Sequence, residues 1–183
     1  MRQPNRKAPL LARCLLLAVL AAGPAMAQSV VSDLNGDGRA ETFTLTGMDD
    51  GRADLTIDGG SSRIVARDIA WAGGIGQKPE LSLAPNGSVR LTSMNEAIGR
   101  NRWRLTLTIA YREGAYRVAG YTYSWYDTLN LPDRGTCDLN LLTGRGVLTL
   151  AERPERAVRT DLRARPVTDW TDDAPRPAAC RDG

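Results

Sequence analysis

The side chains best placed for chemistry lie in one short stretch, residues 33–41, where oxygen ligands recur at alternate positions. Asp33, Asn35 and Asp37 carry carboxylate or amide oxygens, and Glu41 adds another carboxylate. Ca²⁺ prefers about six to eight oxygen ligands from carboxylates, amides, backbone carbonyls and water. Glycines alternate with these residues and allow the backbone to wrap around one point. The spacing therefore predicts a calcium-binding loop.

An EF-hand does not fit this loop. Counted from Asp33, the twelfth position, where an EF-hand carries a bidentate Glu, is Thr44. Residues 42–46 also alternate like a strand, whereas an EF-hand continues as a helix. The spacing instead places Glu41 at the ninth position and the backbone carbonyl of Arg39 at the seventh. The alternative is a polar turn that binds no metal, but such a turn requires no acid at Glu41.

This pattern resembles the calcium loop of FG-GAP and VCBS-type repeats, in which the acid at position nine opens a strand. The resemblance covers residues 33–41. It implies bound Ca²⁺ and a β-rich context, and it implies no reaction.

The start of the chain is typical of a secretory signal. Basic residues precede an apolar run at residues 15–22, and Ala25-Met26-Ala27 forms a cleavage site of the A-x-A type. We therefore expect residues 1–27 to be removed, Cys14 with them, and the mature chain to be secreted or periplasmic. The apolar run is shorter than the roughly 20 residues that span a bilayer, and no later stretch predicts a membrane span.

Removal of the signal changes the charge balance. The whole chain has 24 Lys and Arg against 21 Asp and Glu, and four of the basic residues but no acid lie in residues 1–27. The mature chain then has 20 basic and 21 acidic groups, a net charge near −1. A clustered positive surplus, which nucleic-acid binding requires, is not indicated.

Two cysteines, Cys137 and Cys180, remain in the expected mature chain. Because disulfides persist in oxidising compartments, we expect these two to be paired. The pair would tether the Arg- and Pro-rich tail, residues 151–183, to the preceding domain, residues 28–150. Within this tail we expect a short helix at residues 156–165, ended by Pro166, and Trp170 as the anchor.

The mature body predicts an all-β fold of antiparallel hairpins, arranged as a sandwich or a propeller-like assembly. Residues 42–46 and 53–58 alternate on either side of a turn, and residues 64–71 fit a strand or a short helical turn. In the next hairpin, a Pro85-Asn86-Gly87 loop places Leu83 opposite Val89, with all apolar residues on one face. A further hairpin joins residues 137–142 to 147–150.

Residues 103–112 and 115–126 predict two long strands joined at Glu113-Gly114. Continued without interruption, this pairing places Tyr121, Tyr123 and Trp125 on the face opposite Leu105 and Leu107. Such aromatic side chains could form a platform that stacks on a sugar or a base. The alternative is that a second sheet packs over the rings, and we favour it because aromatic side chains bury well in sandwiches.

A weaker similarity links Gly120-Tyr121-Thr122-Tyr123 and Asn140-Leu141-Leu142-Thr143-Gly144 to a pattern shared by a group of secreted bacterial proteins. This resemblance implies no activity.

The chain lacks the residues that several classes of catalytic site require. The chain has no histidine, which excludes Ser-His-Asp catalysis and His-ligated zinc or copper. Lys78 is the one lysine of the mature chain, and no flanking motif supports a Schiff base or a Ser-Lys pair. Paired carboxylates remain available for glycoside hydrolysis, although no pair is singled out by the sequence.

Two functions therefore stay open. The first is a non-catalytic, calcium-binding module with a binding or envelope-associated role, and we expect a monomer that binds a protein or a glycan. The second is a carboxylate-based hydrolase that acts on polysaccharide or peptidoglycan. We favour the module, since it requires no further catalytic group.

Overall fold

A computed structural model describes residues 28–47, 51–74 and 76–181. The expected signal segment, its cleavage site and Cys14 lie outside these ranges. The described residues form antiparallel β-sheets with two short 3₁₀ helices, which confirms the predicted all-β fold. Among them, no helix has the length and apolar character needed to cross a bilayer.

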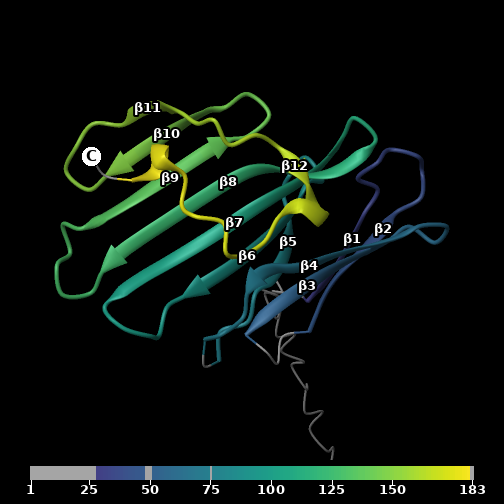
Figure 1. Cartoon of the computed structure of the whole chain (residues 1–183), viewed down its shortest axis with the longest axis horizontal. Coiled ribbons are helices and arrows are strands. Elements are labelled where there is room, and N and C mark those ends of the chain that lie inside the picture. Colours follow the sequence, from purple (N-terminus) through teal and green to yellow (C-terminus); the bar gives the residue numbers. More distant parts are fainter. Residues whose placement is uncertain (1–27, 48–50, 75, 182–183) are drawn as a thin grey trace, which may run out of the picture.

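The N-terminal part of the chain forms a four-stranded antiparallel meander (Figure 1). Its strands follow each other in chain order: β1 (Ser29–Ser32), β2 (Glu41–Thr46), β3 (Arg52–Asp58) and β4 (Arg63–Trp71). Residues 64–71 are therefore strand rather than a helical turn. Alternation of buried and exposed residues along β2 places Phe43 and Leu45 in the core, as the pattern predicts.

The rest of the chain forms an eight-stranded antiparallel sheet. In spatial order its main path is β11 (Arg156–Arg159), β10 (Arg145–Leu150), β9 (Arg134–Asn140), β8 (Ala115–Asp127), β7 (Asn101–Arg112), β6 (Val89–Asn95) and β5 (Glu80–Leu83). A short strand, β12 (Arg165–Pro166), pairs with β8 beside this path. On the main path β11 is therefore an edge strand that pairs only with β10.

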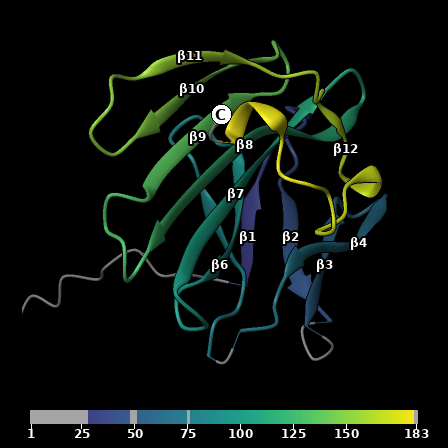
Figure 2. The same cartoon turned by 60° about the vertical axis from the view of Figure 1, so that its left-hand side comes forward.

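The two sheets pack around one apolar core. Side chains from both contribute to a single cluster, among them Phe43 and Leu55 of the smaller sheet and Leu107 and Leu139 of the larger one. Viewed from two directions, the smaller sheet lies against one end of the larger one (Figures 1 and 2). Burial of this apolar surface is the main source of stability for the pair of sheets.

Two predicted hairpins differ in how closely the structure follows them. The Pro85-Asn86-Gly87 loop is confirmed, because Leu83 pairs with Val89 and Leu81 pairs with Leu91, as predicted. In the β9–β10 hairpin, however, the turn occupies residues 141–144, so both strands begin earlier than expected. Asn140 causes the early turn, since its side-chain Oδ1 accepts hydrogen bonds from the backbone N–H groups of residues 142 and 143.

The predicted register of the long hairpin is wrong beyond the four pairs next to its turn. Ile109 pairs with Val118 as expected, but Thr108 then pairs with Gly120, so Ala119 is an extra residue in β8. Such a bulge moves every later side chain to the other face. Consequently Tyr121 lies opposite Leu107, and the aromatic residues of β8 share the face of the leucines.

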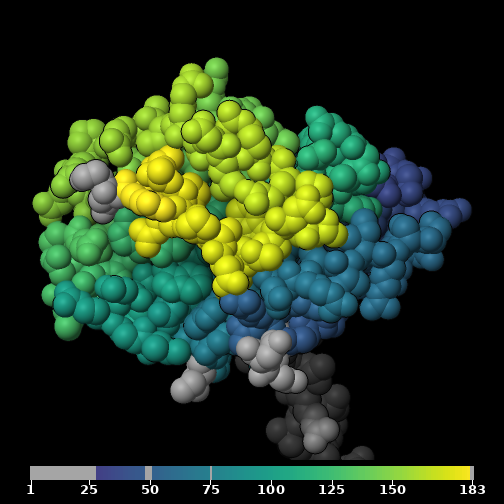
Figure 3. All heavy atoms as spheres, viewed as in Figure 1, coloured from purple at the N-terminus to yellow at the C-terminus, as the bar shows by residue number. Residues whose placement is uncertain are grey.

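The C-terminal tail crosses that face (Figures 1 and 3). The expected helix at residues 156–165 is absent from the described structure: β11 and β12 form instead, followed by two 3₁₀ helices, η2 (Val167–Asp169) and η3 (Ala178–Cys180). Pairing with β10 satisfies the backbone groups that a helix would have satisfied internally. Cys137 and Cys180 are disulfide-bonded, and Trp170 is 2% exposed, so the predicted tether and anchor are confirmed.

Candidate metal centre

The candidate metal loop connects the first two strands of the smaller sheet. Ser32 at the end of β1 pairs with Glu41 at the start of β2, so residues 33–40 form the connection of a hairpin. Within it Gly36 and Gly38 have φ angles of 77° and 84°, a conformation that other residues rarely adopt. The backbone can therefore fold the polar side chains inward.

Short hydrogen bonds within the loop fix most of these side chains. The Asp33 carboxylate accepts the backbone N–H groups of Gly36 and Gly38 at 2.9 and 3.0 Å. Asn35 Oδ1 accepts the N–H of Asp37 at 2.8 Å, and Asp37 Oδ1 accepts that of Arg39 at the same distance. The loop is thus held by its own acids and amide.

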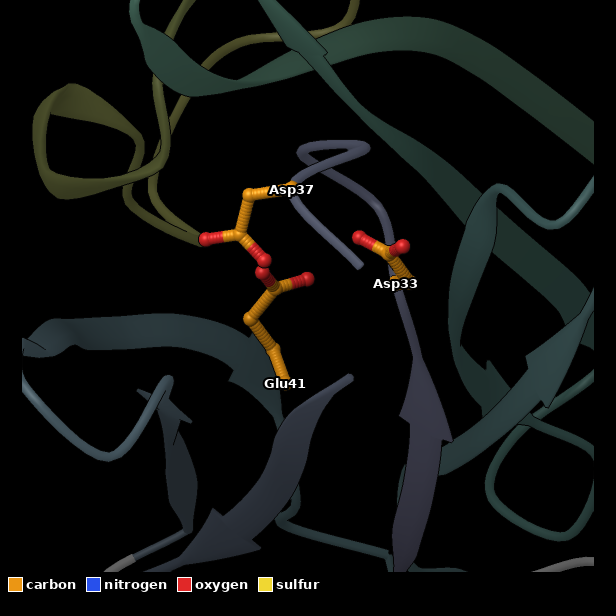
Figure 4. A group of neighbouring side chains, drawn as sticks. All are labelled: Asp33, Asp37 and Glu41. Atoms are coloured by element: carbon orange, nitrogen blue, oxygen red, sulfur yellow. The ribbon is translucent and has the colours of Figure 1, made fainter. Parts of the chain in front are cut away.

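Three carboxylates converge within this frame. Asp33, Asp37 and Glu41 each offer one oxygen, and these oxygens lie within 4.8 Å of one another. Figure 4 shows the three side chains directed toward a common space between the loop and the start of β2. Such a group could hold a metal ion.

Glu41 differs from the two aspartates in its environment. It is 1% exposed, whereas Asp33 and Asp37 are exposed to solvent. Its Oε2 accepts the N–H of Leu34 at 2.8 Å, but its Oε1 is buried without a hydrogen-bond partner. None of the ion pairs of the described residues involves any of the three acids. The cluster therefore contains a buried, unsatisfied anionic oxygen and no compensating cation.

The larger sheet contributes a tyrosine that the sequence did not indicate. The Tyr116 hydroxyl on β8 lies 3.5 Å from Asn35 Nδ2. Burial raises the pKa of Tyr116 to about 12, and the nearby Glu41 carboxylate acts in the same direction. Its ring also meets Phe43 edge-on at 6.0 Å between ring centroids. No local pattern could have identified this residue, because it is 81 positions from Asn35.

The other two predicted ligands, Asn35 and Arg39, lie beside the three carboxylates. Asn35 Nδ2 donates to Asp37 Oδ2 at 3.2 Å, so the amide lies beside the acids. Arg39 is exposed and donates its backbone N–H to Asp37. Three of the five predicted residues therefore form the carboxylate group, and the other two shape the loop around it.

The predicted aromatic platform is a row of stacked rings that the tail covers. Tyr123 lies between Tyr121 and Trp125, with ring centroids 6.4 and 5.8 Å apart. The Arg176 guanidinium lies 4.3 Å from the Tyr123 ring centroid, and it donates a hydrogen bond to the Tyr123 hydroxyl at 2.9 Å. Trp170 packs against Tyr121. Tyr121 is thus buried, and Tyr123 and Trp125 are half-buried. The C-terminal tail lies over these rings, in place of the second sheet that we favoured.

No family model, curated protein or solved structure matches this chain.

Proposed function

We propose that this protein is an exported, non-catalytic module that binds Ca²⁺ through residues 33–41. The observation that carries the proposal is the Glu41 carboxylate, whose buried Oε1 has no hydrogen-bond partner and which lies in one group with two further carboxylates. Leaving such a group unsatisfied costs about 1–3 kcal/mol or more for a charged atom. A bound cation would remove both this cost and the repulsion among the three acids.

The chemistry of the donors favours Ca²⁺ over other metals. All the side-chain donors are oxygens, which hard cations prefer, and no histidine occurs anywhere in the chain. The mature chain's two cysteines are joined in a disulfide away from the loop. Flexible, glycine-rich loops suit the irregular coordination of Ca²⁺ better than the octahedral geometry that Mg²⁺ demands.

The proposed role is binding rather than catalysis. Export is supported by the signal-like N-terminus and by the disulfide, which persists in oxidising compartments. The hydrolase alternative required two acids in a cleft beside Tyr123 and Trp125. The depression lined by Trp125 carries no acidic residue, so no specific observation favours that alternative.

Thermal unfolding with and without Ca²⁺ tests the proposal. At a Ca²⁺ concentration about 100 times the dissociation constant, binding adds about 2.7 kcal/mol to the free energy of unfolding. For a chain of this size, the melting temperature should rise by roughly 5–10 °C, and EDTA should reverse the rise. An unchanged melting temperature, together with no heat of binding by calorimetry, would refute a calcium site.

A Glu41→Gln variant tests whether Ca²⁺ binding can be lost while the fold is kept. It retains an oxygen that can accept the Leu34 N–H but removes the charge of the buried group. We expect it to lose the Ca²⁺-dependent rise while gaining about 1 kcal/mol of stability in EDTA, because the unsatisfied carboxylate is gone. Glu152→Gln, at an exposed position outside the loop, is the matched control and should respond to Ca²⁺ as the wild type does.

A further inference from the structure

The C-terminal tail and the larger sheet enclose a second candidate site, distinct from the metal loop. A cavity of about 530 Å³ lies where Tyr121 of β8 meets tail residues that run from β11 to η3. Pockets that hold small organic molecules typically measure roughly 300–1,000 Å³. The volume is therefore suited to one small ligand.

The cavity has an aromatic floor whose polar atoms make no hydrogen bond to the described residues. Tyr121 and Trp170 are 5% and 2% exposed, and their rings lie 6.2 Å apart. Neither the Tyr121 hydroxyl nor the Trp170 indole N–H has a hydrogen-bond partner among the described residues. Polar atoms of buried Tyr and Trp side chains usually find partners. Both groups can donate a hydrogen bond to a ligand.

The charges around the cavity favour an anion. Arg159 and Arg165 line it, and the Arg165 guanidinium lies 5.5 Å from the centroid of the Trp170 ring. Two acids also line it, but Asp173 is paired with Arg52, which lies outside the lining. Asp161 is the other lining acid, and it has no ion pair in the described structure. The lining therefore carries two arginines and one acid whose charge is not already balanced by a residue outside it.

We propose that this cavity binds a small organic anion whose apolar or aromatic body carries a carboxylate. The body would pack on Trp170 and the apolar tail residues, Pro177 and Ala178 among them. The carboxylate, which only accepts hydrogen bonds, matches the donors of Tyr121, Trp170 and the two arginines. The site does not depend on Ca²⁺, since none of the metal-loop residues lines it.

Benzoate is a suitable probe, and benzamide is its uncharged analogue. The indole N–H signal of Trp170, assigned with a Trp170→Phe variant, should shift saturably as benzoate is added in an NMR titration. Loss of a charge-assisted hydrogen bond weakens binding by roughly 10- to 100-fold. We therefore expect benzamide, and benzoate with Arg159→Gln, to bind at least about tenfold more weakly.

Arg90→Gln is the matched control, because Arg90 is exposed and neighbours Thr108 on the opposite face of the same sheet. It removes the same charge and should leave benzoate affinity unchanged. The proposal is overturned if benzoate produces no saturable shift of Trp170. It is equally overturned if benzoate and benzamide bind alike, or if Arg90→Gln weakens binding as much as Arg159→Gln does.

Discussion

The side chain of Tyr121 is buried between the larger sheet and the tail. Burial raises the pKa of its hydroxyl well above the ordinary value, and the nearby Arg176 opposes this shift only in part. Tyr116 shows the same effect in the core beside the metal loop. Both phenols therefore keep their protons in the folded protein at a pH where an unfolded chain has lost them.

The stability of the protein should consequently fall in alkaline solution. Tyrosine in an unfolded chain ionises near pH 10, so above about pH 10 the unfolded state loses protons that the native state retains. Stability contributed by the two groups is complete below this pH and is lost as the pH rises toward their folded pKa values. Melting temperatures measured by circular dichroism from about pH 9 to 11.5 should decline steadily.

A Tyr121→Phe variant removes one of the two groups without removing the ring. Its decline with pH should be shallower than that of the wild type. An equal slope would show that the hydroxyl is exposed to solvent in the native protein.

At the residue scale, the sequence predicted the acids of the metal loop but not their environments. Alternating oxygens and glycines are a local pattern, so Asp33, Asp37 and Glu41 could be identified from spacing alone. The burial of Glu41 and the approach of Tyr116 depend on how two sheets pack, which no local pattern records. Likewise, Arg159 and Trp170 gave no sign that they line one cavity with Tyr121.

Among the strands, β8 shows how one additional residue moves the later side chains to the other face of the sheet. Ala119 is the additional residue of a bulge, and it places Tyr121, Tyr123 and Trp125 toward the core side. The strands, their turn at Glu113-Gly114 and the first pairs were all predictable from alternation. The bulge was not, because an extra residue leaves the polar and apolar pattern of β8 readable in either register.

The tail follows the larger sheet because it is fixed at several points. Its covalent link, Cys137–Cys180, spans 43 residues of sequence, and Trp170 and Arg176 rest on the aromatic row. In the chain-entropy model, closing a loop of this length contributes about 4 kcal/mol to the free energy of unfolding. The cysteine count and the expected export predicted this link. The strands β11 and β12 could not be predicted in the same way, because they form by pairing with β10 and β8 of the larger sheet.

Removal of the disulfide should lower the melting temperature by roughly 8–16 °C, given the size of the chain. Reduced wild-type protein tests this with both cysteine side chains still in place, and a Cys137→Ala/Cys180→Ala variant should melt at a similar or lower temperature. Trp125 and Tyr123 should become more accessible to acrylamide if the tail detaches. Equal melting of oxidised and reduced protein would mean that noncovalent contacts alone hold the tail.

In the whole molecule, polar contacts add to the shared apolar core in joining the smaller sheet to the rest. Near the metal loop, Asn35 approaches Tyr116, and the Ser32 hydroxyl donates to the carbonyl of Gly87. In the tail, the backbone N–H of Asp172 donates to the carbonyl of Asp68, and Asp173 pairs with Arg52. An ion in the loop would therefore stabilise the contact between sheets as well as the loop itself.

Hydrogen exchange can measure this coupling. Under the proposed function, Ca²⁺ should slow amide exchange in residues 34–41 and also in β8 around Tyr116, while β10 and β11 change little. Glu41→Gln should show neither effect. Slowing confined to the loop would indicate that the ion has no influence on the packing of the two sheets.

The edge strand β11 of the larger sheet affects how copies of the protein associate. If β11 edges of two chains met antiparallel about Ala157 and Val158, Arg156 of each would stand opposite Arg159 of the other. Like charges in that position repel, and charged side chains on an outer strand discourage further pairing. Crowded copies are thus kept from pairing along this border, and concentrated salt, which screens guanidinium groups, would weaken that protection.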